Sequence, residues 1–160
     1  MNYSIGSYKG IRGRDCPGFD ITLLDANGKK VARVADYGAG SICLSWEFLG
    51  KTNEQRLKDA REIEAYAKTL DLKYVIGVDG HADAMVNRLV HLHLTKKDIT
   101  KHMKKGAVMF DKAKKQYAIF NTPQSAVASY ASLQSKYPNM VLLNTMDLDA
   151  AARLVSEASE

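Results

Sequence analysis

The stretch FDITLLDANGKKVARVADY, residues 19–37, decides the fold that the sequence predicts. Its first six residues alternate between apolar and less buried side chains, a pattern typical of a strand with one buried face. Asn27-Gly28 follows, a pair that tolerates the positive φ angles of a tight hairpin turn. The segment KKVARVADY then supplies the return strand, so the stretch predicts an antiparallel β-hairpin.

Neighbouring segments extend this hairpin into a sheet. Phe19, Ile21 and Leu23 share one face of the first strand. After a glycine corner at residues 38–40, residues 42–48 alternate in the same way and place Trp46 on the apolar side. An edge strand formed by Tyr3, Ile5 and Ser7 precedes a loop, GIRGRDCPG. We expect a meander of three or four strands whose apolar face needs a cover.

Helices are expected to supply that cover. Thr52 and Gln55 match a capping box at the start of residues 52–70. The apolar side chains of this segment recur at helical spacing: Leu57, Ala60, Ile63, Ala67 and Leu70. A second helix is expected over residues 82–94, and a separate short helix after Thr95 that ends at Gly106. Residues 74–78 fit either a strand or an apolar loop.

The last third of the sequence predicts a second hairpin and two more helices. Residues 107–121 form the hairpin, with three lysines at its turn. Thr122-Pro123 begins a helix that runs to about Tyr137, and residues 140–144 are a short strand candidate. The final helix, residues 146–160, turns the side chains listed here toward the core: Leu148, Ala152 and Val155.

These elements predict an α+β protein: an N-terminal antiparallel β-meander packed against helices, a second β-hairpin and a helical C-terminal half. The length of 160 residues, 46% of them hydrophobic, suits a single domain over residues 1–160. Within it we expect a sheet module at 1–50 and a mainly helical part at 51–160. No signal or membrane segment is evident, so we expect a cytoplasmic protein that does not contact membranes.

Positive charge is concentrated in one segment of the chain. Residues 96–115 hold eight lysines against two aspartates, a balance of +6, whereas the formal net charge of the whole chain is +5. Such a cluster can attract an acidic partner, or it can be a solvated face that only keeps the protein soluble. The predicted binding residues are two loop arginines and five of these lysines: Arg12, Arg14, Lys104, Lys105, Lys112, Lys114 and Lys115.

No catalytic constellation stands out, so no enzymatic activity and no cofactor are predicted. Cys16 lies beside arginines that favour a thiolate, but no histidine occurs in the first eighty residues to serve as its base. Asp79, His81, Asp83, His91 and His93 are the only cluster of potential metal ligands. The two last histidines are separated by about 200° on a helix, so polar surface residues are favoured over a metal site.

Aromatic residues in the second hairpin allow two interpretations. Phe110, Tyr117 and Phe120 alternate with lysines, an arrangement that single-stranded nucleic-acid binders use for base stacking and phosphate attraction. In a half-buried hairpin the same rings would pack inward as core residues, which is the favoured interpretation here.

Two stretches resemble a family of small, functionally uncharacterised proteins encoded by bacteriophages and prophages. The first is KGIRGRDCPGFDITLLDANGKKVARVADYGAGS, with its glycine and Arg-Asp loop and its glycine corner. The second is KKGAVMFDKAKKQYAIFNTP followed by KYPNMVLLN. Together they cover about half the chain and carry no catalytic residue. The resemblance implies an accessory phage protein made in an infected bacterium.

We therefore expect a non-enzymatic inhibitor of a bacterial host or defence system that acts through a basic surface. Its partner would be an acidic surface of a bacterial protein or nucleoprotein complex, and the sequence does not specify the oligomeric state. A nucleic-acid-binding accessory protein is the main alternative, and its affinity would fall steeply as salt rises. A metal-dependent hydrolase using residues 79–91 is a third possibility.

Overall fold

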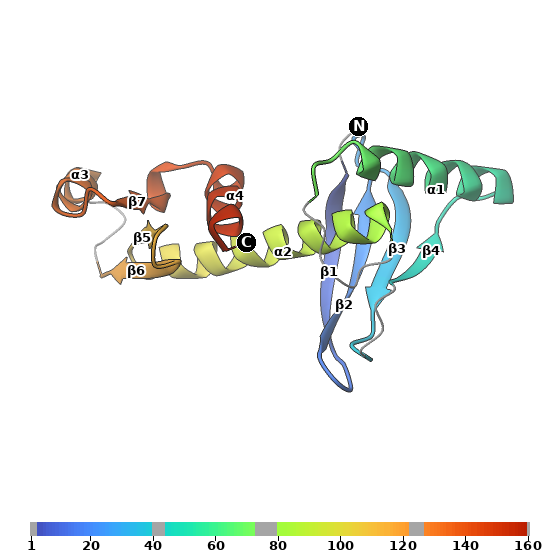
Figure 1. Ribbon diagram of the computed structural model, residues 1–160, viewed down its shortest axis with the longest axis horizontal. Helices are drawn as coiled ribbons and strands as arrows, with labels where there is room; N and C mark the ends of the chain where they lie inside the picture. Colours follow the sequence, from blue (N-terminus) through green and yellow to red (C-terminus); the bar gives the residue numbers. More distant parts are fainter. Residues whose placement is uncertain (1–2, 40–43, 73–79, 122–126, 160) are drawn as a thin grey trace. The chain divides into compact units, whose positions relative to one another are not determined.

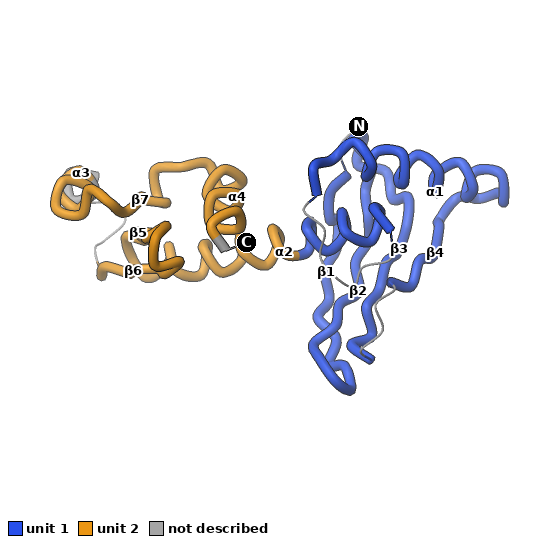
Figure 2. The backbone as a smooth tube through the Cα atoms, in the orientation of Figure 1, with its two compact units in different colours: residues 1–90 blue, residues 91–160 orange. Residues whose placement is uncertain are grey.

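The computed structural model describes residues 3–39, 44–72, 80–121 and 127–159. The chain has the predicted α+β architecture, with an N-terminal antiparallel meander, a second small sheet and helices (Figure 1). It divides into two compact units, residues 1–90 (unit 1) and 91–160 (unit 2), shown in Figure 2. A single domain over residues 1–160 would unfold in one cooperative step. The division into compact units does not test this, so the expectation of a single domain stays a prediction.

Unit 1 contains a sheet of four strands in the order β1-β2-β3-β4, each pair antiparallel. Its strands are β1 (Ser4–Arg12), β2 (Pro17–Leu24), β3 (Lys30–Asp36) and β4 (Ser45–Phe48). The hairpin predicted around Asn27-Gly28 is confirmed, with Gly28 at a φ of 75°. The Asp25 carboxylate accepts hydrogen bonds from the N–H groups of Asn27 and Lys29, each at 2.9 Å, which fixes the turn.

Strand β1 is longer than the sequence predicts. Gly10, Ile11 and Arg12 pair with residues at the start of β2, so the first three positions of the predicted loop GIRGRDCPG belong to a strand. The loop proper is only residues 13–16. The prediction was wrong because glycine has a low strand propensity, whereas pairing with β2 satisfies the backbone groups of these residues.

The apolar face of this sheet forms the core of unit 1 with two helices. Ile21 and Leu23 are fully buried, as the alternation predicts. Helix α1 (Asn53–Lys68) starts at its Thr52 cap, whose hydroxyl accepts the N–H of Gln55 at 3.1 Å. The helices contribute the remaining apolar side chains of this core: Ile63 and Ala67 from α1, and Met85, Val86 and Val90 from α2 (His81–Met103).

One side chain on α1 contradicts the predicted inward face. Leu57 is 59% exposed, whereas Asp59, two residues later, is only 5% exposed. The inward face follows Ile63 and Ala67, which lie in contact with the sheet residues of the core. The prediction that Leu57 faces inward is therefore wrong.

A buried carboxylate connects the first turn of α2 to β4. Asp83 is 6% exposed and accepts a hydrogen bond from the indole N–H of Trp46 at 2.6 Å and from the backbone N–H of Leu44 at 3.1 Å. Trp46 is partly buried against the core of unit 1, as predicted, and stacks on Phe48 with ring centroids 5.7 Å apart. Asp83 thus has a structural role that its sequence context did not reveal.

Helix α2 is one uninterrupted helix of 23 residues, so the predicted break after Thr95 is wrong. No glycine or proline occurs within α2. Thr95 alone lowers helix stability too little to end the helix. The turn after Met103 leads to Gly106, as predicted, where the N–H of Lys105 donates to the carbonyl of His102 at 2.9 Å.

Unit 2 contains the predicted second hairpin within a sheet of order β6-β5-β7. Its strands are β5 (Ala107–Asp111), β6 (Gln116–Phe120) and β7 (Met140–Leu142). Helix α3 (Val127–Lys136) precedes β7, and a short 3-10 helix η1 (Leu143–Thr145) leads to α4 (Leu148–Ser159). The proposed helix start at Thr122-Pro123 and the ambiguous segment 74–78 lie outside the described residues.

Strand β5 is buried on both faces. Val108 and Phe110 pack in one cluster with Ile99 of α2 and with Ala152 of α4, and Met109 packs in another with Leu142. Ala152 and Val155 face inward as predicted, but Leu148 is 36% exposed, so that part of the prediction is wrong. Leu148 is the first residue of α4, where Asp147 caps the helix at the surface.

No helix in the described ranges is long and apolar enough to cross a lipid bilayer. The longest of them, α2, carries charged residues along its second half.

We expect Asp83→Ala to destabilise unit 1 by about 1–3 kcal/mol, because the indole N–H of Trp46 and the N–H of Leu44 lose their shared acceptor in a partly buried place. Urea unfolding followed by the fluorescence of Trp46, the only tryptophan, measures this. Glu47→Ala is the matched control, because this exposed β4 carboxylate lies 4.0 Å from Arg33 and exposed ion pairs contribute little. Equal effects of the two substitutions would contradict the role assigned to Asp83.

Candidate functional site

The five predicted binding lysines of unit 2 lie at the two ends of β5. Lys104 and Lys105 occupy the turn that ends α2, and Lys112, Lys114 and Lys115 form most of the turn between β5 and β6. All five side chains are exposed. Because β5 has five residues at about 3.3 Å each, the two groups are separated by roughly 17 Å along the strand. We call these five residues the hairpin lysines.

A half-buried aspartate shapes the tip of the hairpin. One carboxylate oxygen of Asp111 accepts the N–H groups of Ala113 and Lys114, each at 3.0 Å, and its other oxygen lies 4.0 Å from the Lys114 ammonium. Lys115 has a φ of 55°, the only positive φ among the described residues other than glycine. A left-handed lysine is disfavoured by contact between its Cβ and the backbone, so this turn holds a charged side chain where glycine would be the easier residue.

The other end of β5 is fixed by a side-chain amide. Asn144 accepts the N–H of Val108 at 2.6 Å and donates to the carbonyl of Gly106 at 3.2 Å. Gly106 and Val108 follow Lys104 and Lys105 in the chain. The two hydrogen bonds therefore attach the backbone next to these lysines to η1, which contains Asn144.

Two further lysines, which the sequence analysis did not single out, extend this basic region along α2. Lys97, Lys101 and Lys104 are exposed and follow one another at i, i+4 and i+7, the spacing of a single helix face. The signal was present in the sequence, because the short helix predicted after Thr95 already contains all three lysines. Cations in the last turns of a helix also interact favourably with the helix dipole, which gives these lysines a structural benefit as well.

Acidic neighbours neutralise only part of this segment. Lys96 forms an ion pair with Asp149 of α4, and His102 Nε2 lies 3.3 Å from the Asp98 carboxylate. Within the described ranges, no carboxylate comes within 4.0 Å of the remaining lysines named here: Lys101, Lys104, Lys105, Lys112 and Lys115. Their charge is thus available to a partner.

The aromatic residues of the hairpin face inward, as favoured from the sequence. Phe110 is 1% exposed, and Tyr117 packs between it and the His102 ring at centroid distances of 5.4 and 5.3 Å. Burial, with a smaller effect of the Asp98 charge, raises the pKa of the Tyr117 phenol. Phe120 packs against Tyr137, with ring centroids 5.3 Å apart. These rings are held in packing contacts and do not form an open stacking platform.

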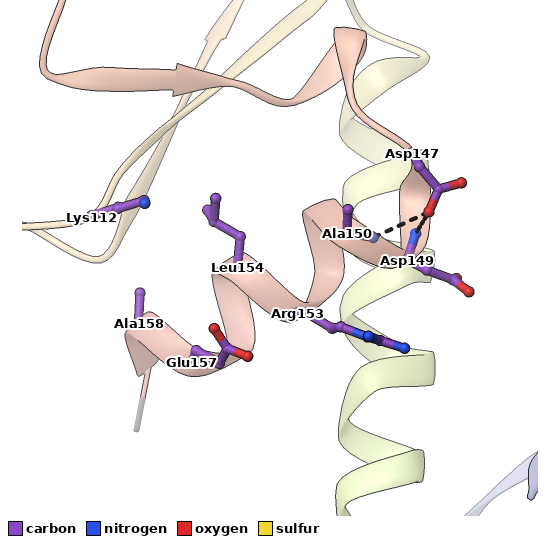
Figure 3. A pocket seen from close by; sticks show the side chains of 8 residues that line it. All are labelled: Lys112, Asp147, Asp149, Ala150, Arg153, Leu154, Glu157 and Ala158. Atoms are coloured by element: carbon purple, nitrogen blue, oxygen red, sulfur yellow. Dashed lines mark hydrogen bonds between the residues drawn. The ribbon is translucent and has the colours of Figure 1, made fainter. Parts of the chain in front are cut away.

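An open groove of about 750 Å³ runs along α4 beside Lys112 (Figure 3). Ala150, Leu154 and Ala158 form its apolar floor at i, i+4 and i+8. Acidic and basic side chains both line it, and Asp147 caps the helix by accepting the N–H groups of Asp149 and Ala150. The mixed charge gives this groove no preference for an anion.

The loop with the two predicted arginines is built on close glycine contacts in unit 1. The carbonyl of Gly38 accepts the N–H groups of Asp15 and Cys16 at 2.9 and 3.2 Å. A Cβ on Gly13 would lie 2.5 Å from the Gly38 Cα, so any larger residue at Gly13 would separate the two segments. The glycine-rich loop and the glycine corner, two separate motifs in the sequence, therefore form a single feature.

The arginines differ in how much of their charge is neutralised. Arg33, on the exposed face of the sheet, binds Asp20 through two guanidinium nitrogens and thereby lowers the pKa of that carboxyl. Arg14 lies 3.9 Å from Asp15, with 90% of its side chain exposed, and Arg12 is exposed at the end of β1. Arg12 and Arg14 belong to unit 1, and the hairpin lysines belong to unit 2.

The candidate metal ligands are distributed among separate contacts. His81 Nδ1 lies 3.3 Å from Glu64, Asp83 binds Trp46, and His91 is exposed. The pKa of His93 is lowered by burial and then by the nearby lysines. No three His, Cys, Asp or Glu side chains gather as a metal site in the part of the chain that is described, which leaves out Asp79 and Cys43. Cys16 is a free, exposed thiol.

Comparison with protein-family models, with curated proteins and with solved structures finds no match for this chain.

We expect Lys115→Gly to stabilise unit 2 by about 0.5–1 kcal/mol, because glycine adopts a positive φ without the contact that Lys115 makes through its Cβ. Lys114→Gly is the matched control in the same turn and should destabilise by a similar amount, since its φ is not positive and glycine only adds freedom to the unfolded chain. Thermal unfolding followed by circular dichroism measures both. Destabilisation by both substitutions would show that Lys115 is not strained.

Proposed function

We propose that this chain is a small phage-encoded binding protein that inhibits a bacterial host or defence system without catalysing a reaction. It would act in the cytoplasm of the infected bacterium by holding an acidic surface of a protein or nucleoprotein complex. The observation that carries the proposal is a set of exposed lysines at the end of α2 and the tip of the β5–β6 hairpin. Among the described residues, no carboxylate lies within 4.0 Å of Lys104, Lys105, Lys112 or Lys115, and Lys114 lies 4.0 Å from Asp111.

The arrangement of charge favours a folded acidic partner. The two groups of hairpin lysines lie at opposite ends of β5, whose first four residues are buried, so the separation of the two groups is set by the fold. Positively charged side chains held at fixed positions match a surface of fixed shape and raise the rate of association with it. A flexible basic tail would lack that geometric selectivity.

Nucleic acid is the alternative occupant of the same surface, and the hairpin geometry favours it less. Binding of single strands normally combines phosphate contacts with base stacking on exposed aromatic rings. Here Phe110 is buried, and Tyr117 and Phe120 are engaged in ring packing. Phosphate contacts alone would give binding without sequence preference.

The phage origin and the inhibitory role are supported by the resemblance of residues 9–41, 104–123 and 136–144 to small phage proteins. The first stretch contains the glycine contacts that shape the arginine loop of unit 1. The C-terminal stretches contain the hairpin lysines and strand β7, which pairs with β5 in unit 2.

Affinity capture from infected bacterial lysate, with and without nuclease, tests the proposal. We expect a protein partner that survives nuclease treatment and is lost, by at least about tenfold, when Lys112, Lys114 and Lys115 are all replaced by glutamate. The control replaces three exposed lysines of unit 1, Lys9, Lys30 and Lys51, by glutamate, which changes the net charge equally.

Three results would contradict the proposal. Equal loss with both triple variants would mean that only net charge matters, and no loss with the hairpin variant would remove the hairpin lysines from the interface. Capture that disappears with nuclease, together with an affinity that falls by about 0.7–0.9 log units per contacted phosphate for each log unit of salt, would identify nucleic acid as the partner.

A further inference from the structure

The groove along α4 has an apolar floor with the same order of side chains in both chain directions. Ala150, Leu154 and Ala158 recur every four residues and lie in one row along the helix (Figure 3). Antiparallel reversal about Leu154 exchanges the two alanines and leaves the leucine in place. The floor is therefore complementary to a second copy of itself related by a twofold axis, which is the commonest symmetry of homodimers.

A row of alternating charges follows one side of this floor. Asp149, Arg153 and Glu157 each directly precede one of the three floor residues, and all three side chains are exposed. With Leu154 at the twofold axis, Arg153 and the Glu157 of a second copy are separated by only about 3 Å along the helix axis, because each residue rises about 1.5 Å. A long arginine side chain spans that offset, so the dimer would contain this ion pair twice.

The two charges of this pair are not neutralised within their own chain. Among the described residues, no carboxylate lies within 4.0 Å of Arg153 and no cation lies within 4.0 Å of Glu157. The two residues are four positions apart on one helix, yet the guanidinium of Arg153 extends away from the Glu157 carboxylate (Figure 3). Both charges are thus available to an opposite charge on another molecule.

The opposite wall of the groove adds a second pair of complementary charges. Lys112 lies beside the C-terminal half of α4, and Asp147 lies at the N-terminal end, where it caps the helix (Figure 3). In an antiparallel dimer the C-terminal half of one α4 lies beside the N-terminal half of the other, so Lys112 approaches the Asp147 of the second copy. A partner surface of a single charge would match only half of these groups, and charge complementarity therefore favours a second copy of the chain.

We propose that the chain forms a twofold dimer through this groove, with the two α4 helices antiparallel and Arg153 of each copy paired with Glu157 of the other. The apolar floor consists of only three side chains, so the buried area falls at the low end for protein interfaces and the dimer is weak and transient. The dimer goes beyond the proposed function, and Lys112 is the one residue of the hairpin lysines that belongs to both surfaces.

Sedimentation equilibrium of the full chain tests the proposal. We expect a monomer–dimer equilibrium with a Kd of roughly 10–500 µM. Leu154→Glu places two carboxylates at the twofold axis and should weaken dimerisation by at least about tenfold. Leu94→Glu is the matched control, because Leu94 is 41% exposed on α2 and lies outside the groove, so this variant should leave the Kd unchanged.

Exchange of the two charges shows whether Arg153 and Glu157 meet between copies. Arg153→Glu and Glu157→Arg should each weaken dimerisation by about tenfold, since each substitution brings like charges together. An equimolar mixture of the two variants should dimerise again, because every glutamate of this pair then faces an arginine. Both side chains are exposed, so the substitutions leave the fold intact and the test holds even if Leu154→Glu fails to fold.

Three results would overturn the proposal. The first is a monomer at every concentration up to about 1 mM, where a dimer of the expected affinity would predominate. The second is an equal effect of Leu94→Glu and Leu154→Glu. The third is a mixture of the two charge variants that associates no better than either variant alone. Dimerisation needs no bacterial partner, so its failure and the failure of the proposed function are observed separately.

Discussion

Aspartate carboxylates that accept N–H hydrogen bonds stabilise turns, a helix start and a helix–strand contact within each unit separately. Asp25 closes the β2–β3 turn, Asp111 closes the β5–β6 turn, and Asp147 caps α4, each by accepting two backbone N–H groups. Asp83 accepts two donors across a sequence separation of 37–39 residues. The short side chain of aspartate suits the local bonds, because its oxygens reach backbone N–H groups two to four residues away.

The aspartates that accept backbone N–H groups are fixed in turns and at a helix start. Among the described residues, they lie more than 4.0 Å from most of the hairpin lysines. At the hairpin tip the Asp111 carboxylate holds the turn, and Lys114 approaches it only to 4.0 Å. Residues 96–115 hold eight lysines against two aspartates, so most of the positive charge of the chain lies in one segment of unit 2.

Local patterns in the sequence predicted the elements that depend on near neighbours. The alternation of Phe19, Ile21 and Leu23, the Asn27-Gly28 turn and the Thr52 cap are each confirmed, because each involves residues within a few positions of one another. The five hairpin lysines were likewise identified from the charge of one segment, and the structure places all five on its surface.

Features that depend on distant partners could not be predicted in this way. The hydrogen bonds of Asp83 to Leu44 and Trp46 require knowledge of how α2 lies on the sheet, and the same residue looked like a metal ligand in the sequence. The contact of Gly13 with Gly38 joins two motifs that are 25 positions apart, and neither motif alone specifies the other. The continuity of α2 past Thr95 is supported by Ile99 in the core of unit 2, which local propensity does not register.

Helix α1 shows how a tertiary contact overrides a local pattern. Its sequence offers two candidate inward faces, one that includes Leu57 and one that includes Asp59, and local hydrophobicity favours the first. Ile63 and Ala67 are buried in the core of unit 1, and their burial sets the rotation of the helix. Asp59 lies four residues before Ile63, on the same helix face, and is therefore carried inward with it. Its burial follows from the packing of the helix, and the side chain of Gln55, one turn earlier, donates a hydrogen bond to its Oδ1.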